Sequence, residues 1–250
     1  MSVVTAVIVK IGAIDMNNDT PDSNGSLWYV TDSIAGWDSP TQRLSAIARP
    51  TKRGERTVEN LYGARMLTVS GVCKAQSAAL MYTSMYYLMS VTNALVNTTT
   101  LKVTEDIERY CDVLRSGEVR TAYVGKGAFT FEVNLRADDP FKYAVTGNTN
   151  GLVGGVPEVL ANAGTVQTFP VITLTASGAP TITVGSYTWT ATSSIPSGSV
   201  IDMKAMTVLN GSTSYFDAVS PSTDWLWLDP GNNTVQSSVA CNVAWKDAWV

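Results

Sequence analysis

The sequence predicts a mainly β protein of two domains, the first of them α+β with a single helix. Short apolar runs of strand length recur along the 250-residue chain, whereas only one segment follows a clear helical period. The composition changes near residue 143, which indicates a domain boundary. A hydrophobic content of 45% with 15% charged residues is typical of a folded chain, and this length suffices for two buried cores.

Strands are predicted in the first domain at residues 3–11, at residues 65–73 and around Phe129. The alternation is clearest from Phe129 to Leu135, where apolar residues interleave with polar ones up to the turn at Asp138-Asp139-Pro140. The helix is predicted to begin at Ala78, with Ser77 as its N-cap. Its apolar positions follow helical spacing: Met81, Tyr82, Met85, Leu88 and Met89.

The second domain is expected to be a two-sheet β-sandwich, because short β-like runs follow one another with turn residues between them. The turns are predicted at Gly178-Ala179-Pro180, Asn210-Gly211 and Asp229-Pro230-Gly231-Asn232. The predicted strands are residues 171–174, 181–184, 187–189, 200–203, 207–209, 225–228 and 235–239.

Charge and turn residues place the boundary between the two domains. Residues 1–143 carry 15 Lys and Arg against 15 Asp and Glu, whereas residues 144–250 carry 2 against 6. The stretch from Thr146 to Pro157 is dense in Gly, Asn and Thr and reads as turn and linker. We therefore predict domains at residues 1–145 and 146–250.

Catalytic and metal-binding chemistry finds little support in the composition. The chain has no histidine, which excludes the commonest serine, cysteine and zinc hydrolase designs. Its three cysteines, at positions 73, 111 and 241, are odd in number, show no metal-like spacing and are expected to be buried and reduced. We expect no catalytic residue, no metal and no cofactor.

Two acidic stretches have weak alternative interpretations. Asp15, Asn17 and Asp19 match the first ligands of a calcium-binding EF-hand loop, but Thr20 and Ser26 replace the required Gly and Glu, so a polar loop is favoured. Asp138-Asp139 is the nearest approach to a pair of catalytic carboxylates, and it lies in a strand-ending turn.

A basic cluster follows Trp37 and has three interpretations: a nucleic-acid contact, a solvated loop or a subunit interface. The first domain is neutral overall, which disfavours nucleic acid, and arginine is enriched at interfaces. We therefore favour an interface. Its candidate residues are Trp37, Arg43, Arg49, Lys52, Arg53 and Arg56.

Three tryptophans of the second domain, Trp189, Trp225 and Trp227, are candidates for a glycan-stacking surface. In a strand, Trp225 and Trp227 share one face, and Leu226 and Leu228 share the other. The alternative is that these indoles lie in the core, which is the commoner place for tryptophan.

An ordered set of motifs resembles the distal tail protein (Dit) family of long-tailed, non-contractile bacteriophages. The set comprises Trp37-Asp38-Ser39-Pro40, the strand and helix from Met66 to Val91, Phe129 to Tyr143, Asn162-Ala163-Gly164-Thr165 with Phe169-Pro170-Val171-Ile172, and Trp227-Leu228-Asp229-Pro230-Gly231-Asn232-Asn233. The resemblance implies a first domain with a split barrel or sandwich and one helix that forms a ring, and a galectin-like second domain.

The same resemblance implies a structural virion protein at the tail tip, assembled in the host cytoplasm and not an enzyme. Its implied partners are further copies of itself in a hexameric ring, the tail-tube protein, the tail-tip hub and the tape-measure protein, with phage DNA in transit through the lumen. No apolar stretch reaches the roughly 18 residues of a membrane span, so no membrane insertion is expected. Three alternatives stay open: a host-glycan or receptor-binding module, a carboxylate-dependent glycosidase, and a major tail-tube protein.

Overall fold

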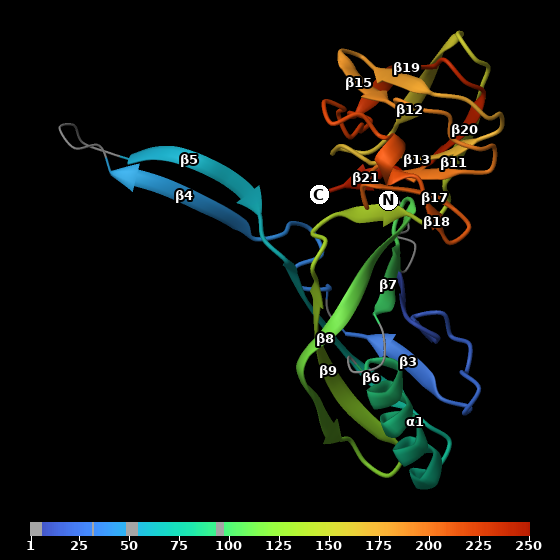
Figure 1. Cartoon of the computed structure of the whole chain (residues 1–250). Helices are drawn as coiled ribbons and strands as arrows, with labels where there is room; N and C mark the ends of the chain where they lie inside the picture. The colour runs from blue at the N-terminus through green and yellow to red at the C-terminus, as the bar shows by residue number, and fades with distance from the viewer. Residues whose placement is uncertain (1–6, 32, 49–54, 94–97) are drawn as a thin grey trace, which may run out of the picture. The chain divides into compact units, whose positions relative to one another are not determined.

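The structure, a computed structural model, describes residues 7–31, 33–48, 55–93 and 98–250. It divides into two compact units, one comprising Met1–Lys142 with Val250 and the other Tyr143–Trp249. The described residues are mainly β with one α-helix (Figure 1), so the predicted fold class is confirmed. None of the described helices has the length and hydrophobicity that a bilayer crossing requires.

The first unit is built on an antiparallel sheet in the order β2-β1-β7-β8-β9-β6-β3. Long β8 pairs with two neighbours: residues 108–113 pair with β7, and residues 114–123 pair with β9 on both sides of a register shift between Arg115 and Val119. The elements are β1 (Ile8–Ile11), β2 (Ile14–Met16), β3 (Leu27–Val30), β4 (Gln42–Ala48), β5 (Glu55–Tyr62), β6 (Arg65–Lys74), α1 (Ala78–Val91), β7 (Thr99–Thr104), β8 (Glu108–Tyr123) and β9 (Ala128–Ala137).

The two end strands of this sheet are joined through Asn17. Its backbone N–H donates to the carbonyl of Trp28 in β3 at 2.9 Å, and its side-chain oxygen accepts from the Val30 N–H at 2.8 Å. Its amide nitrogen donates to the Val7 carbonyl at 3.0 Å. These bonds close the sheet into a split barrel, and we call this junction the Asn17 seam.

Strands β4 and β5 form a separate two-stranded sheet. Figure 1 shows this hairpin extending away from the rest of the first unit. Among the described strands, β4 and β5 pair only with each other, so both outer edges of the hairpin present backbone groups without a neighbouring strand. We call this element the β4–β5 hairpin.

Buried and exposed side chains alternate along the long strands, so one face of these strands lies in the core of the first unit. Phe129 and Phe131 of β9 are buried and contact Trp28 edge-on, with ring centroids 5.9 and 5.6 Å away. The apolar face of α1 packs on this core through Met81, Met85 and Leu88. This face is why the strand at Phe129 and the helix were predictable, and both predictions are confirmed.

The second unit contains two antiparallel sheets around one core. The sheets have the orders β11-β20-β13-β16-β17-β18 and β12-β19-β14-β15, and β10 pairs with β21. The elements are β10 (Lys142–Ala144), β11 (Asn148–Leu152), β12 (Pro157–Asn162), β13 (Val171–Leu174), β14 (Thr181–Val184), β15 (Tyr187–Thr190), β16 (Val200–Asp202), β17 (Thr207–Asn210), β18 (Thr213–Ser214), η1 (Phe216–Ala218), β19 (Gly231–Ser237), β20 (Cys241–Trp245) and β21 (Ala248–Trp249).

Two local predictions differ from the structure, and a third is tested only in part. The stretch 146–157, expected to be turn and linker, contains β11, because this polar segment pairs with β20 as an edge strand. Residues 225–228 form no strand, since the backbone there is bonded only near its ends, Asp224 to Thr188 and Leu228 to Thr168. The predicted strand at residues 3–11 is seen as Ile8–Ile11, and residues 3–6 lie outside the described part.

Candidate functional site

The loop that carries the Trp37-Asp38-Ser39-Pro40 motif contacts a fully buried arginine, Arg65, which is the first residue of β6. Arg65 donates from Nε to the Pro140 carbonyl at 2.8 Å, and from Nη1 to the carbonyls of Gly36 at 2.9 Å and Trp37 at 2.6 Å. Lys142 Nζ donates to the same Trp37 carbonyl at 3.1 Å and lies 5.2 Å from the centre of the Trp37 ring. We call these five residues the Arg65 network.

The electrostatics of the Arg65 network fit a structural role. Burial lowers the pKa of Lys142, and the nearby positive charge of Arg65 lowers that pKa further. Burial also lowers the pKa of Arg65. Two cations are held together here because carbonyl oxygens and an indole face solvate them, as buried charges require.

Gly36 explains why the loop before Trp37 can approach β6. Its φ is +81°, and a Cβ atom there would lie 1.9 Å from the Met66 carbonyl oxygen. Only glycine fits this left-handed, crowded position. Trp37 itself is 4% exposed and lies in the core, so its indole is not available to a neighbouring subunit as the sequence interpretation required.

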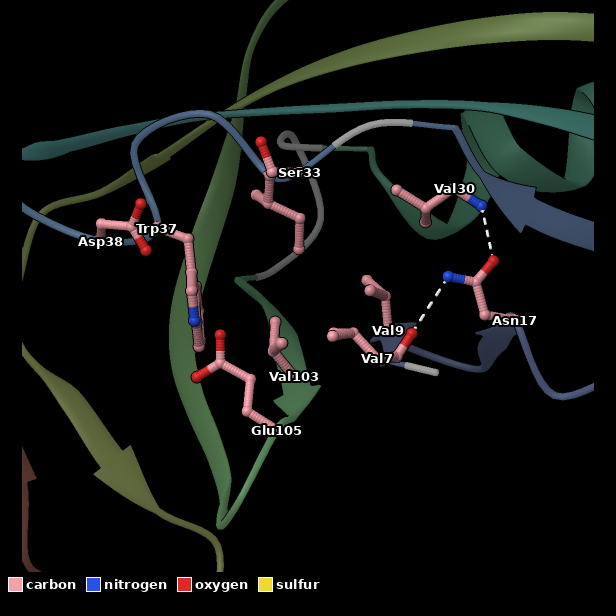
Figure 2. Close-up of a pocket in the computed structure, with 10 residues that line it drawn as sticks. Val7, Val9, Asn17, Val30, Ser33, Trp37, Asp38, Val103 and Glu105 are labelled. Carbon is pink, nitrogen blue, oxygen red and sulfur yellow. Dashed lines mark hydrogen bonds between the residues drawn. The ribbon is translucent and has the colours of Figure 1, made fainter. Parts of the chain in front are cut away.

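A cavity of about 220 Å³ lies between Trp37 and the Asn17 seam (Figure 2). Its walls include Val9, Val30 and Val103, with the carboxylates of Asp38 and Glu105 at its margin. Small-molecule sites usually measure about 300–1,000 Å³ and combine apolar walls with convergent polar groups. This cavity is smaller, so it does not indicate a substrate pocket.

The predicted basic interface maps onto the β4–β5 hairpin. Arg43 lies in β4 and is exposed, and Arg56 lies in β5 opposite Ile47. Arg49, Lys52 and Arg53 lie outside the described residues. The two described arginines of the cluster therefore lie on a hairpin that is separate from the main sheet of the first unit.

The motifs of the second unit build turns. Asn233 is buried, accepts the Asp229 N–H at 2.9 Å, and donates to the carbonyls of Asp229 at 2.8 Å and Gly231 at 3.0 Å. Asn162 is also buried and donates to the carbonyls of Val166 and Leu228 at 2.8 and 3.2 Å. The side chains of these two asparagines thus supply hydrogen-bond partners to backbone groups of the turns.

The three candidate glycan-binding tryptophans occupy different environments. Trp189 is fully buried and belongs to the core, so it cannot contact a glycan. Trp225 and Trp227 are half-buried, whereas Leu226 and Leu228 between and after them are fully buried. Burial therefore alternates along this segment as the sequence indicated, although the segment is not a strand and Trp225 also packs against the core.

The acidic residues in and beside the two candidate stretches have local structural partners. Asp15 pairs with Lys10 at 3.1 Å. Asp22 accepts the N–H groups of Asn24 and Ser26, each at 2.9 Å, and the indole N–H of Trp28 at 2.8 Å. Asp138 pairs with Arg136 at 2.8 Å, and Asp139 accepts the Phe141 N–H at 3.1 Å. These carboxylates shape loops and turns.

The three cysteines are free and buried, as predicted. Burial raises the pKa of the Cys73 and Cys111 thiols to about 12, and it also raises the pKa of Cys241. Thiols with such pKa values carry almost no nucleophilic thiolate at neutral pH.

Sequence reasoning missed Tyr187 and Phe216 as members of a surface. Tyr187 lies 4.5 Å from Trp227, and Phe216 stacks at 6.4 Å on Trp225, centroid to centroid. Both pairs join residues distant in sequence, so no local period could have revealed them. Their residue type was the only available signal, since exposed aromatic residues mark interaction surfaces.

Most of the second unit matches a known protein family. Residues 163–249 match the family described as siphovirus-type tail component, C-terminal domain. The second unit is therefore similar to that domain over most of its length. The matched residues contain the whole Asn233 turn, and Asn162 directly precedes them.

Solved structures extend the comparison to the whole chain. The crystal structure of the Dit protein (gp 19.1) of phage SPP1, described as a paradigm of the hub adsorption apparatus in phages that infect Gram-positive bacteria, has a TM-score of 0.78 at 12% identity. The match covers 98% of this chain and 100% of that chain. A chain in the baseplate of phage p2, in its activated conformation with Sr, has a TM-score of 0.52 at 11% identity, with 96% and 98% covered.

The comparisons confirm the resemblance to distal tail proteins that the motifs indicated, and the Dit-like fold with it. Comparison with curated protein sequences found no significant match.

Proposed function

We propose that this protein is a structural component of a siphophage tail tip, in which the first unit forms a ring between the tail tube and the tip hub. The observation that carries the proposal is the Dit fold over 98% of the chain, together with the tail component domain at residues 163–249. In this role the protein acts by assembling and catalyses no reaction. Its partners are further copies of itself, the tail-tube protein and the hub, and DNA leaves through the lumen of the ring.

The β4–β5 hairpin supports self-association. An isolated two-stranded ribbon is marginally stable in water, and its open edges can pair with another chain. A ring needs one face of each subunit to fit a different face of the next, and charge complementarity fixes their register. By sequence, residues 42–62 carry five Lys and Arg against Glu55 and Glu59, a net positive charge that an acidic face of the next subunit would match.

The proposal predicts that reversing this charge prevents closure of the ring. We expect the wild-type chain to form a discrete closed ring, alone or with tail components, and the double variant Arg43→Glu/Arg56→Glu to stay monomeric with unchanged circular dichroism. Light scattering over a concentration series gives the mass, and negative-stain microscopy gives the shape. Lys126→Glu, an exposed charge reversal in the turn before β9, is the matched control and should still assemble.

The outcomes separate the proposal from the tail-tube alternative. Open filaments of stacked rings would favour a tube protein. A strictly monomeric chain that attaches to neither tail tube nor hub would contradict the ring, and a double variant that assembles like wild type would remove the hairpin from the interface.

A further inference from the structure

Four aromatic side chains gather on the surface of the second unit in two contacting pairs. Tyr187 and Trp227 have ring centroids 4.5 Å apart, and Phe216 and Trp225 stack at 6.4 Å with an interplanar angle of 11°. Tyr187 is 41% exposed and Phe216 is 53% exposed, whereas the two indoles are half-buried. We call these four residues the aromatic strip.

The backbone joins the two pairs into one surface. Trp225 and Trp227 are separated by one residue, Leu226, which is fully buried, whereas both indoles are half-buried. Trp225 also packs against the core of the second unit. The two pairs therefore lie on neighbouring parts of one segment.

The indoles are held in place before any ligand arrives. Trp225 also packs edge-on against buried Trp189, with centroids 6.4 Å apart. Trp227 donates its indole N–H to Asp229 Oδ1 at 3.2 Å. A surface fixed in this way loses little side-chain entropy on binding.

Hydrogen-bond acceptors flank the strip. Asp224 and Asp229 are both exposed, and each uses one carboxylate oxygen within the protein: Asp224 Oδ2 accepts the Thr188 N–H at 3.0 Å, and Asp229 Oδ1 accepts from Trp227. Among the described residues, no hydrogen bond engages the second oxygen of either carboxylate. Hydroxyl groups that donate to carboxylates make strong, charge-assisted hydrogen bonds.

Charge narrows the class of ligand. Between Lys204 and Lys246 the sequence contains no lysine or arginine, and the strip lies within acidic surroundings that include Asp217, Asp224 and Asp229. A polyanion such as nucleic acid requires cations that this surface lacks. A neutral sugar ring, in contrast, has an apolar C–H face for the aromatic rings and hydroxyl groups for the carboxylates.

We propose that the aromatic strip binds a neutral glycan made of pyranose rings, with Trp227 and Tyr187 as the main stacking surface and Asp229 as a hydroxyl acceptor. This activity is separate from ring formation, because it uses none of the residues of the β4–β5 hairpin.

The test measures binding of the full-length protein to four neutral hexasaccharides, built from α-glucose, β-glucose, N-acetylglucosamine or mannose, by isothermal titration calorimetry. Heparin serves as the charged probe. We expect at least one hexasaccharide to bind and heparin not to bind. Trp227→Ala and Tyr187→Ala should each weaken the sugar affinity roughly tenfold, since an aromatic contact contributes about that factor. Tyr86→Ala is the matched control, because Tyr86 is 64% exposed in the other unit, and its affinity should equal wild type.

Three results would overturn the proposal: no hexasaccharide binds at millimolar concentration, sugar binding survives both strip substitutions, or the strip variants lose attachment to a tail protein while no sugar binds. The last result would assign the strip to a protein partner. Because Tyr187 is exposed, its variant keeps the test decisive if Trp227→Ala unfolds. Ring formation measured on the same variants should be unchanged.

Discussion

At the scale of single residues, buried polar side chains determine the path of the loops. The guanidinium of Arg65 replaces three separate backbone partners by donating to carbonyls at residues 36, 37 and 140. These carbonyls in turn solvate the buried guanidinium, since a buried charge without hydrogen bonds would cost free energy. Trp37 is thus part of the core, and Arg65 fixes its position through a hydrogen bond to its carbonyl.

We expect Arg65→Met to lower the free energy of unfolding of the first unit by about 3 kcal/mol, because the carbonyl oxygens lose charged donors. Urea unfolding followed by circular dichroism measures the loss. Arg136→Ala is the control, since Arg136 pairs with Asp138 while both side chains are more than half exposed, and such pairs contribute less than about 1 kcal/mol. Equal effects of the two substitutions would show that the buried bonds add nothing.

The cysteines give a prediction about pH. The pKa of Cys73 and Cys111 is about 12 in the folded chain, above the ordinary value of 9.0. The folded state therefore keeps these protons at pH values where the unfolded chain loses them, and their contribution to stability is present below pH 9 and falls as pH rises toward 12.

Accordingly, Ellman's reagent at pH 8 should label none of the three thiols in the native protein and all three in denaturant. Rapid labelling of the native chain would contradict the burial of Cys73, Cys111 and Cys241.

At the scale of elements, the helix shows what a sequence pattern can reveal. Ser77 accepts the Leu80 N–H at 3.2 Å, as expected for an N-cap. The first turn of α1 contains no acidic residue, so Ser77 is the only side chain described that satisfies an N-terminal donor of this helix. The helix was predictable because its period, its cap and its position next to strong strands all agree.

We expect Ser77→Ala to lower the free energy of unfolding by about 1 kcal/mol, and Ser77→Asp to restore it, because a carboxylate caps and also interacts favourably with the helix dipole. Thermal unfolding measures both variants. Thr83→Ala, a change to another helix hydroxyl, should have little effect, since Thr83 bonds only the carbonyl one turn earlier. If Ser77→Ala left the free energy of unfolding unchanged, water would replace the hydrogen bond of the cap.

Other elements could not be predicted because long-range contacts decide them. Residues 225–228 alternate like a strand, yet among the described residues their backbone bonds join only Leu228 to Thr168, and Asp224 just before them bonds Thr188. Residues 148–152 look like a linker, yet β20 offers them a complete ladder. Local composition cannot show which partner strand is available to a segment. For the same reason, it could not predict the contacts of Tyr187 with Trp227 and of Phe216 with Trp225.

At the scale of the whole molecule, the two units have separate cores, so we expect separate responses to core damage. Leu160 is 1% exposed in the core of the second unit. Leu160→Ala should lower the stability of that unit by about 2–5 kcal/mol and leave the first unit unchanged. Hydrogen exchange monitored by mass spectrometry reports both, with β6 and β9 as probes of the first unit.

The neighbouring Val159 supplies the control, because it is 60% exposed and Val159→Ala should leave exchange unaltered throughout. Faster exchange in β6 and β9 of the Leu160→Ala protein would mean that the units unfold as one cooperative block. The sequence placed a change of composition near this boundary, but only the packing of each core shows what unfolds together.

The Asn17 seam has a consequence for the mechanics of the first unit. Every other junction between neighbouring strands of the barrel is a ladder of backbone bonds, whereas the seam depends on one residue with φ +62°. Under mechanical force, we therefore expect the barrel to open first between β2 and β3, because a single residue holds this junction and ladders of backbone bonds hold the others. The first unit can therefore widen along the seam while its other strand pairs stay intact.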